Sequence, residues 1–160
     1  MKNLKKIQTM INFDAGKYAL TFTMTLGRSQ ELILGNLELV YPSGEKVDYL
    51  TTSGIPDWQR PEDQWSRGKG PIPAGDYEIP SEPYWLDTRG VEGFFFHITP
   101  DPVSSGDRIR SELGVHYDAN VPGTAGCIGF INPDGWERFL RRMAKIAALG
   151  VKSLPLKVKY

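Results

Sequence analysis

The chain has 160 residues, of which 40% are hydrophobic and 24% charged, a size and composition typical of one globular domain. Nineteen basic residues balance nineteen acidic ones, which argues against a general nucleic-acid binder because such proteins usually carry a basic excess. The single cysteine excludes a disulfide bond within the chain. We therefore expect a single domain over residues 1–160, and we expect no nucleic-acid partner.

The N-terminal residues include three lysines, Lys2, Lys5 and Lys6, but no apolar run follows them. We therefore expect no signal peptide, and a protein that is made in the cytoplasm. No stretch of the chain approaches the roughly 20 apolar residues of a membrane helix, so we expect no membrane span. The sequence leaves the oligomeric state open.

The first half of the chain predicts β-structure. Residues 18–26 alternate apolar side chains with threonine, which is the pattern of a half-buried strand. The apolar residues within 31–41 predict further strand structure, with a possible hairpin turn at Gly35-Asn36. A turn at residues 42–44 then leads to a further strand at residues 46–52.

A long loop at residues 53–75, dense in glycine and proline, separates this part from the rest. Loops of this length are often functional, although an irregular surface crossing is the alternative. Further strands are expected at residues 76–79, 93–98, 113–116 and 154–160, with a polar, turn-rich segment at 103–112. The architecture is therefore mainly β, a sandwich or barrel.

The sequence predicts a helix that begins after Asn132, because Asn132 is a good N-cap residue and Pro133 suits the first helical position. Its apolar residues recur at helical spacing, and Gly150 is a plausible C-terminal stop. We therefore expect one substantial helix after the cysteine.

The chemistry is concentrated between His116 and Cys127, which lie eleven positions apart with a Pro-Gly pair between them. A thiolate attacks carbonyl carbons, and an adjacent imidazole stabilises it and later protonates the leaving amine. Gly126 has no side chain, so it allows backbone N–H groups near Cys127 to point at one spot as an oxyanion hole. A thiol paired in this way should react with iodoacetamide below neutral pH.

Two other interpretations of these residues stay open. Free cysteine is among the most buried residue types, so Cys127 is alternatively an inert core residue. His97, His116, Asp118 and Cys127 are ligand types that bind zinc, but none falls in a tight metal-binding spacing, and we expect neither a metal nor a cofactor. His97 lies in an aromatic strand, where we expect it to have a structural partner.

The residues around this pair resemble the catalytic domain of the L,D-transpeptidase (YkuD-like) family. The similar segments are Val115-His116, Thr124-Ala125-Gly126-Cys127-Ile128 and, upstream, residues 52–54 and 72–77. The resemblance extends over residues 35–130. It implies an L,D-transpeptidase-like β-sandwich or barrel in which Cys127 is the nucleophile and His116 the base. The Gly126 and Cys127 amides would then be the oxyanion donors.

The resemblance also implies the substrate, which would be a peptidoglycan stem peptide that is either cross-linked or hydrolysed through one thioester. Gly129 replaces the arginine or asparagine common in the family, so Arg108 or Arg110 is the candidate for the substrate carboxylate, unless both are merely solvated. Thr124 and Tyr117 are further candidates for substrate binding.

A non-catalytic module on the same fold, for example a component of a virion or secretion apparatus, is the alternative function. An enzyme of this kind would act on the periplasmic cell wall after delivery by lysis, a virion or a secretion system.

Overall fold

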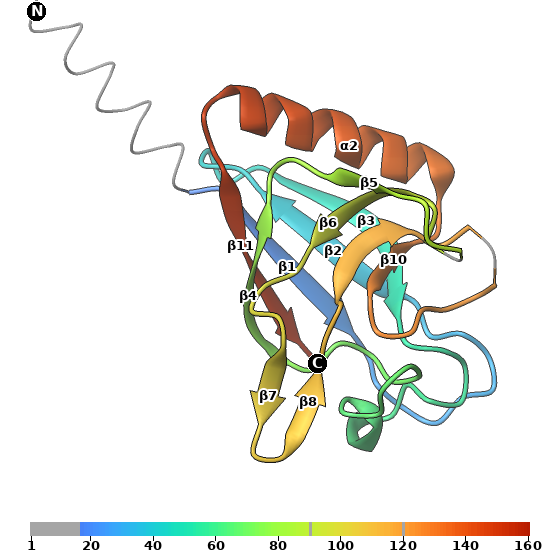
Figure 1. Cartoon of the computed structure of the whole chain (residues 1–160). Helices are drawn as coiled ribbons and strands as arrows, with labels where there is room; N and C mark the ends of the chain where they lie inside the picture. Colours follow the sequence, from blue (N-terminus) through green and yellow to red (C-terminus); the bar gives the residue numbers. More distant parts are fainter. Residues whose placement is uncertain (1–16, 90, 120) are drawn as a thin grey trace, which may run out of the picture.

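The structure is a computed structural model that describes residues 17–89, 91–119 and 121–160 (Figure 1). The N-terminal segment on which the absence of a signal peptide was predicted lies outside these residues. No helix in the described ranges is long and apolar enough to cross a membrane.

The described residues form one curled sheet of nine strands in the order β4-β11-β1-β2-β3-β10-β9-β6-β5. The strand bounds are β1 (Ala19–Met24), β2 (Gly35–Val40), β3 (Lys46–Ser53), β4 (Gly75–Pro80), β5 (Tyr84–Leu86), β6 (Gly93–His97), β9 (Gly114–Tyr117), β10 (Ile128–Phe130) and β11 (Ser153–Lys159). A separate hairpin consists of β7 (Val103–Ser105) and β8 (Arg108–Arg110), and the long loop contains a short 3-10 helix, η1 (Pro61–Asp63). The helix α2 (Pro133–Ala148) follows β10.

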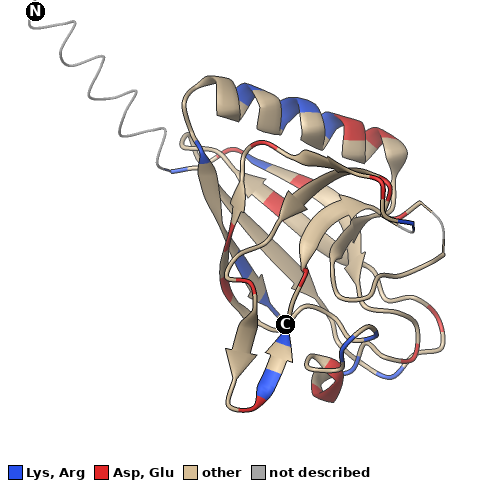
Figure 2. Cartoon of the chain, viewed as in Figure 1, with Lys and Arg blue, Asp and Glu red and all other residues tan. Residues whose placement is uncertain are grey.

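This architecture confirms the expected mainly β fold with one substantial helix after Cys127. The N-cap is also confirmed, because the Asn132 side chain accepts hydrogen bonds from the backbone N–H groups of Asp134 and Gly135. Along α2 the acidic residues lie at the N-terminal end and the basic residues follow them (Figure 2).

The core lies between one face of the curled sheet and α2. Side chains of β1 and β11 alternate between buried and less buried positions, as expected for strands with one face in the core. An aromatic cluster joins the helix to the sheet, with ring centroids 4.9 Å apart for Phe130 and Phe139 and 6.0 Å apart for Phe96 and Trp136. Such packing holds β10 and β6 in place, and both strands lead to the candidate site.

Gly35 is not part of a hairpin turn, so that prediction was wrong. It begins β2, where it pairs with Met24 on β1 and Thr51 on β3. A Cβ atom at Gly35 would lie 2.8 Å from the carbonyl oxygen of Thr23. The glycine therefore permits close strand packing instead of a turn.

The segment expected to be polar and turn-rich, residues 103–112, contains a turn between two strands that were not predicted, and this β7–β8 hairpin projects from the sheet (Figure 1). The short strands β5 and β10 were not predicted either. With three residues each, they are too short to show a clear alternation in the sequence.

Candidate active site

Strand register brings His116 and Cys127 to the same face of the sheet. On the parallel strands β9 and β10, His116 lies opposite Gly129, and Val115 lies opposite Ile128. Because side chains alternate along a strand, Val115 and Ile128 face the core, where both are fully buried, and His116 faces the other way. Cys127, two positions before Gly129, has its side chain on the face of His116, and both residues line one cavity of about 270 Å³.

Strand β6 adds an aromatic floor and a second histidine to this face. His97 lies opposite Gly114 on β9, so His97 and Phe95 point to the same side as His116. The Phe95 ring stacks on the His116 ring, with centroids 6.0 Å apart and an angle of 18° between the planes. A Cβ atom at Gly114 would lie 2.0 Å from the Phe95 ring, so this packing requires glycine.

The hydrogen bonding of His116 determines which nitrogen carries its proton. Nδ1 lies 3.0 Å from the carbonyl oxygen of Tyr117, and because a carbonyl only accepts, Nδ1 is the protonated nitrogen. Nε2 is therefore an acceptor, and it is buried with no hydrogen-bond partner among the described residues. Burial lowers the pKa of His116, and the Tyr117 carbonyl and the Asp118 carboxylate oppose that shift. His116 is thus a neutral base with its accepting nitrogen unused.

The thiol of Cys127 lies where three cavities meet, of about 270, 330 and 460 Å³. Only 8% of the residue is exposed, and Sγ donates a hydrogen bond to the Glu112 carbonyl at 3.7 Å. Burial raises the pKa of the Cys127 thiol to about 11, although the Gly114 backbone N–H and the Arg110 guanidinium act in the opposite direction. The thiol is therefore protonated at neutral pH, and it is not hydrogen-bonded to His116 in this structure.

Thr124 holds the loop that presents the cysteine. Its hydroxyl accepts hydrogen bonds from the backbone N–H groups of Gly54 (3.1 Å) and Gly126 (3.2 Å) and donates one to the Cys127 carbonyl (2.5 Å). The Thr124 side chain, which was a candidate for substrate binding, is thus fully engaged within the protein. The Gly126 N–H, a candidate oxyanion donor, is engaged as well.

Arg110 joins the long loop to the cysteine loop. Nη1 donates hydrogen bonds to the carbonyls of Gln64 (2.6 Å) and Pro71 (3.0 Å), and Nη2 donates to those of Gly70 (3.1 Å) and Ala125 (2.9 Å). The residue is only 2% exposed. Burial lowers the pKa of Arg110, and the nearby Cys127 opposes that shift. A substrate carboxylate could bind to this guanidinium only by displacing these carbonyls.

Gly126 lies against the Arg110 side chain, at a position where only glycine fits. Its φ of +138° is in the region that favours glycine, and a Cβ atom there would lie 2.1 Å from Nη2 of Arg110. Gly126 therefore allows the unusual backbone conformation and leaves room for the Arg110 side chain.

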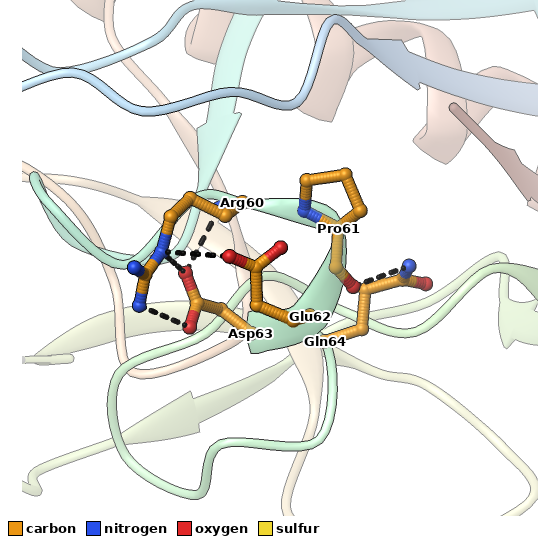
Figure 3. A network of polar contacts seen from close by, with 5 residues as sticks. All are labelled: Arg60, Pro61, Glu62, Asp63 and Gln64. Carbon is orange, nitrogen blue, oxygen red and sulfur yellow. Dashed lines mark hydrogen bonds and ion pairs between the residues drawn. The ribbon is translucent and has the colours of Figure 1, made fainter.

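Polar contacts connect the residues of the long loop to one another (Figure 3). Arg60 binds both carboxylate oxygens of Asp63, with distances of 2.8 Å from Nε and 3.0 Å from Nη2. The Gln64 side chain donates to the Pro61 carbonyl and accepts from the Ala74 N–H. This frame fixes the carbonyl of Gln64 for Arg110, and the loop contributes Arg67 and Gly68 to the cavity of about 330 Å³.

The two tryptophans of the loop carry cations on their rings. Lys69 Nζ lies 4.3 Å from the centroid of Trp58, and the Arg108 guanidinium lies 4.9 Å from that of Trp65. Arg108 is exposed on β8 and lines none of the three cavities that Cys127 lines. Tyr117 packs against the core, and its contribution to the site is the carbonyl that holds His116.

Two arginines that the sequence did not single out line cavities with Cys127. Arg67 borders the cavity of about 330 Å³, and Arg89 borders the one that also contains His116. No spacing or motif marked either residue, because their positions depend on how distant loops fold together. Within the described ranges, no three His, Cys, Asp or Glu side chains are arranged to hold a metal ion.

No family model matches the chain, and neither a curated protein nor a solved structure gives a match. The geometry of the site and the sequence motif therefore carry the functional argument.

Proposed function

We propose that the protein is a cysteine acyl transferase or peptidase that acts on peptidoglycan stem peptides through a Cys127 thioester. The observation that carries this proposal is the state of His116. Its Nδ1 proton is committed to the Tyr117 carbonyl, its Nε2 is buried without a partner among the described residues, and His116 lines a cavity that Cys127 also lines. A buried polar atom without a partner is costly, and here it is a base on a residue that shares a cavity with the chain's single thiol.

In the first step, Cys127 Sγ leaves the Glu112 carbonyl and transfers its proton to His116 Nε2 as it attacks the substrate carbonyl carbon. The imidazolium that forms is stabilised by the Tyr117 carbonyl and the Asp118 carboxylate, both of which raise the pKa of His116. It then protonates the leaving amine, and the acyl group stays on sulfur as a thioester.

In the second step, an amine or water attacks the thioester carbonyl, and loss of the sulfur gives a new amide or a free acid. The nucleophile's proton passes to the departing sulfur, which regenerates the thiol. An amine acceptor gives transpeptidation, and water gives hydrolysis.

The proton transfer is coupled to attack and does not precede it. The thiol has a pKa of about 11, and burial lowers the pKa of the imidazole, so both shifts keep the proton on sulfur in the free site. A resting thiolate–imidazolium pair is therefore hardly populated. In this respect the site differs from the preformed ion pair that the sequence suggested.

Some of the candidate groups are engaged within the protein, so we assign their roles to neighbouring groups. The Gly126 N–H is bonded to Thr124, so we assign the substrate oxyanion to the Cys127 N–H. Arg110 and Arg108 are engaged elsewhere, so we assign the substrate carboxylate to Arg89, which borders the cavity of His116 and Cys127.

The peptidoglycan substrate is supported by the motif around Cys127 and by the family resemblance, and an enzyme of this kind would reach the periplasmic cell wall by lysis, a virion or a secretion system. One observation favours the alternative, a non-catalytic binding or structural module. The thiol is protonated and bonded to the Glu112 carbonyl, which is also how an inert buried cysteine would lie.

The test uses purified full-length protein and isolated stem tetrapeptides and cross-linked peptide dimers, with products identified by mass spectrometry. The wild type should convert at least one of them and carry a transient acyl adduct on Cys127. Cys127→Ala should lose both while keeping its circular dichroism spectrum, and Arg108→Met serves as a surface control with activity retained. Full activity of Cys127→Ala would exclude the enzyme, and binding without conversion would favour the module.

A further inference from the structure

A chain of hydrogen bonds connects the thiol to the second histidine. Cys127 Sγ donates to the Glu112 carbonyl at 3.7 Å, and the Glu112 N–H donates to Asp101 Oδ1 at 3.3 Å. The other oxygen of that carboxylate, Oδ2, lies 3.2 Å from His97 Nε2. His97 therefore has an acidic partner, and that partner is held by the same residue that holds the thiol.

The backbone of Glu112 is in an unusual conformation that makes this connection possible. Its φ is +58°, which is uncommon for a residue other than glycine. In this conformation its N–H is bonded to Asp101 and its carbonyl to Cys127. Backbone strain of this kind is often found at functional sites.

His97 and Asp101 border a cavity of about 460 Å³ that also reaches Cys127. Among the residues that the structure describes, this cavity shares Val91, Ala125 and Cys127 with the one that contains His116. The side chains around it divide into an apolar group and a polar group. The apolar wall consists of Leu86, Val91 and Phe95, and the polar end of His97, Asp101 and Glu112.

We infer that His97 and Asp101 form a second acid–base pair, which takes the proton of an aliphatic amine that attacks the Cys127 thioester. This inference rests on the function proposed above. The two carboxyl side chains at the polar end, Asp101 and Glu112, attract an alkylammonium ion, and a primary amine must lose its extra proton before it can attack. The apolar wall accommodates the carbon chain of the amine.

The step is balanced as follows. The ammonium loses one proton to solvent or to a carboxylate, and the neutral amine attacks the thioester carbonyl carbon. His97 takes the second proton as the C–N bond forms, and Asp101 stabilises the imidazolium. The C–S bond then breaks, the amide product leaves, and the proton from His97 returns to the Cys127 sulfur directly or through water.

Two separate cavities give this arrangement a physical advantage. The first leaving amine is protonated by His116 in the cavity that contains Asp118, whereas the acceptor enters beside His97. The leaving group and the acceptor therefore need not exchange places within one pocket. His97 is 32% exposed, so it can pass protons to solvent between turnovers.

The experiment uses the full-length protein and a p-nitrophenyl ester of an N-acylated amino acid, with Nα-acetyl-lysine amide as the acceptor. The burst of nitrophenol reports thioester formation, and the steady-state yield of the amide product reports the second step. His97→Gln should keep the burst rate within about 2-fold but lower aminolysis about 100-fold, the size of a general-base contribution. The acyl adduct on Cys127 should then accumulate in intact-mass spectra.

Two further variants separate a chemical role from a structural one. Added imidazole should restore aminolysis in His97→Ala, which a purely structural role does not predict. Arg108→Met, at an exposed position that does not line this cavity, should leave both steps unchanged. Should His97→Gln fail to fold, Asp101→Asn carries the same comparison, with a raised acceptor KM.

An unchanged aminolysis rate in His97→Gln, or an equal loss of burst and aminolysis, would overturn the assignment of His97 while leaving Cys127 as the nucleophile. The absence of any burst in the wild type would instead overturn the proposed function, and the second-step role with it.

Discussion

Nη2 of Arg110 donates a 2.9 Å hydrogen bond to the carbonyl of Ala125, two residues before Cys127. The same side chain holds three carbonyls of the long loop, so one buried cation fixes a cavity wall relative to Cys127. No carboxylate lies within ion-pair distance of it in the described part of the chain. Its charge is therefore balanced by carbonyl dipoles, and its field favours the thiolate.

Replacing Arg110 with methionine should destabilise the protein by about 3–5 kcal/mol, because four carbonyls lose their donor. The thiol should also become less acidic, so alkylation at pH 9 should slow. Urea denaturation measures the first effect and iodoacetamide kinetics the second. Arg108→Met is the matched control on the same strand. Losing the exposed Arg108 cation from the Trp65 ring should lower the stability by about 1 kcal/mol or less. Equal losses of stability in the two variants would contradict the role of Arg110 in holding the two loops together.

Alkylation of the native protein should be slow at neutral pH and should increase toward pH 11. With a pKa of about 11, the fraction of thiolate at pH 7 is roughly two to three orders of magnitude smaller than for a thiol with the ordinary pKa of about 8.5. The protein unfolded in urea is the control, and because the chain has one cysteine, the labelled site is unambiguous. A native rate that levels off below pH 7 would show a preformed thiolate.

The expected slow alkylation changes the value of thiol labelling as a test of function. Slow labelling at neutral pH, first expected only of an inert cysteine, is also what the proposed active site should show before substrate binds. Detection of the acyl adduct therefore distinguishes enzyme from module, and labelling of the free protein does not.

Stability should depend on pH through His116. Its pKa is lower in the folded state than the ordinary 6.5, so the unfolded chain binds a proton more readily. The stabilisation is therefore fully present above pH 6.5 and declines as the pH falls toward the folded-state pKa. The free energy of unfolding, measured in urea from pH 5 to 8, should lose this part of its slope in His116→Gln. Because the other groups are common to both proteins, the difference between the two curves isolates His116.

The same shift predicts the acidic limb of activity. His116 must be neutral to accept the thiol proton, so kcat/KM should decline only below pH 6.5. A limb centred above pH 7 would mean that another group controls the reaction.

Arg89→Gln should raise KM for a stem peptide with a free carboxylate by about 10-fold, the scale of one charge-assisted hydrogen bond. The effect should disappear with the amidated peptide, which has no charge to bind. Arg67→Gln is the matched variant on the other cavity and should change KM less. A larger effect of Arg67→Gln would move the carboxylate to that cavity.

Several features followed from the sequence alone because they depend on neighbours in the chain. The strands β1, β3 and β11 and the Asn132 cap follow from local patterns, and each was found close to where it was predicted. The spacing of His116 and Cys127 identified the pair that the sheet brings to one face.

Tertiary structure decided the rest, because burial and hydrogen bonding at this site come from segments far apart in the chain. Gly35 looked like a turn until strand packing showed why it has no side chain. Arg110 looked like a solvent-exposed or substrate-binding residue, but the loop 53–75 surrounds it with carbonyls. The acidity of Cys127 is determined in the same way, since desolvation by the packed sheet and loops outweighs the nearby cation, and no local sequence pattern encodes that balance.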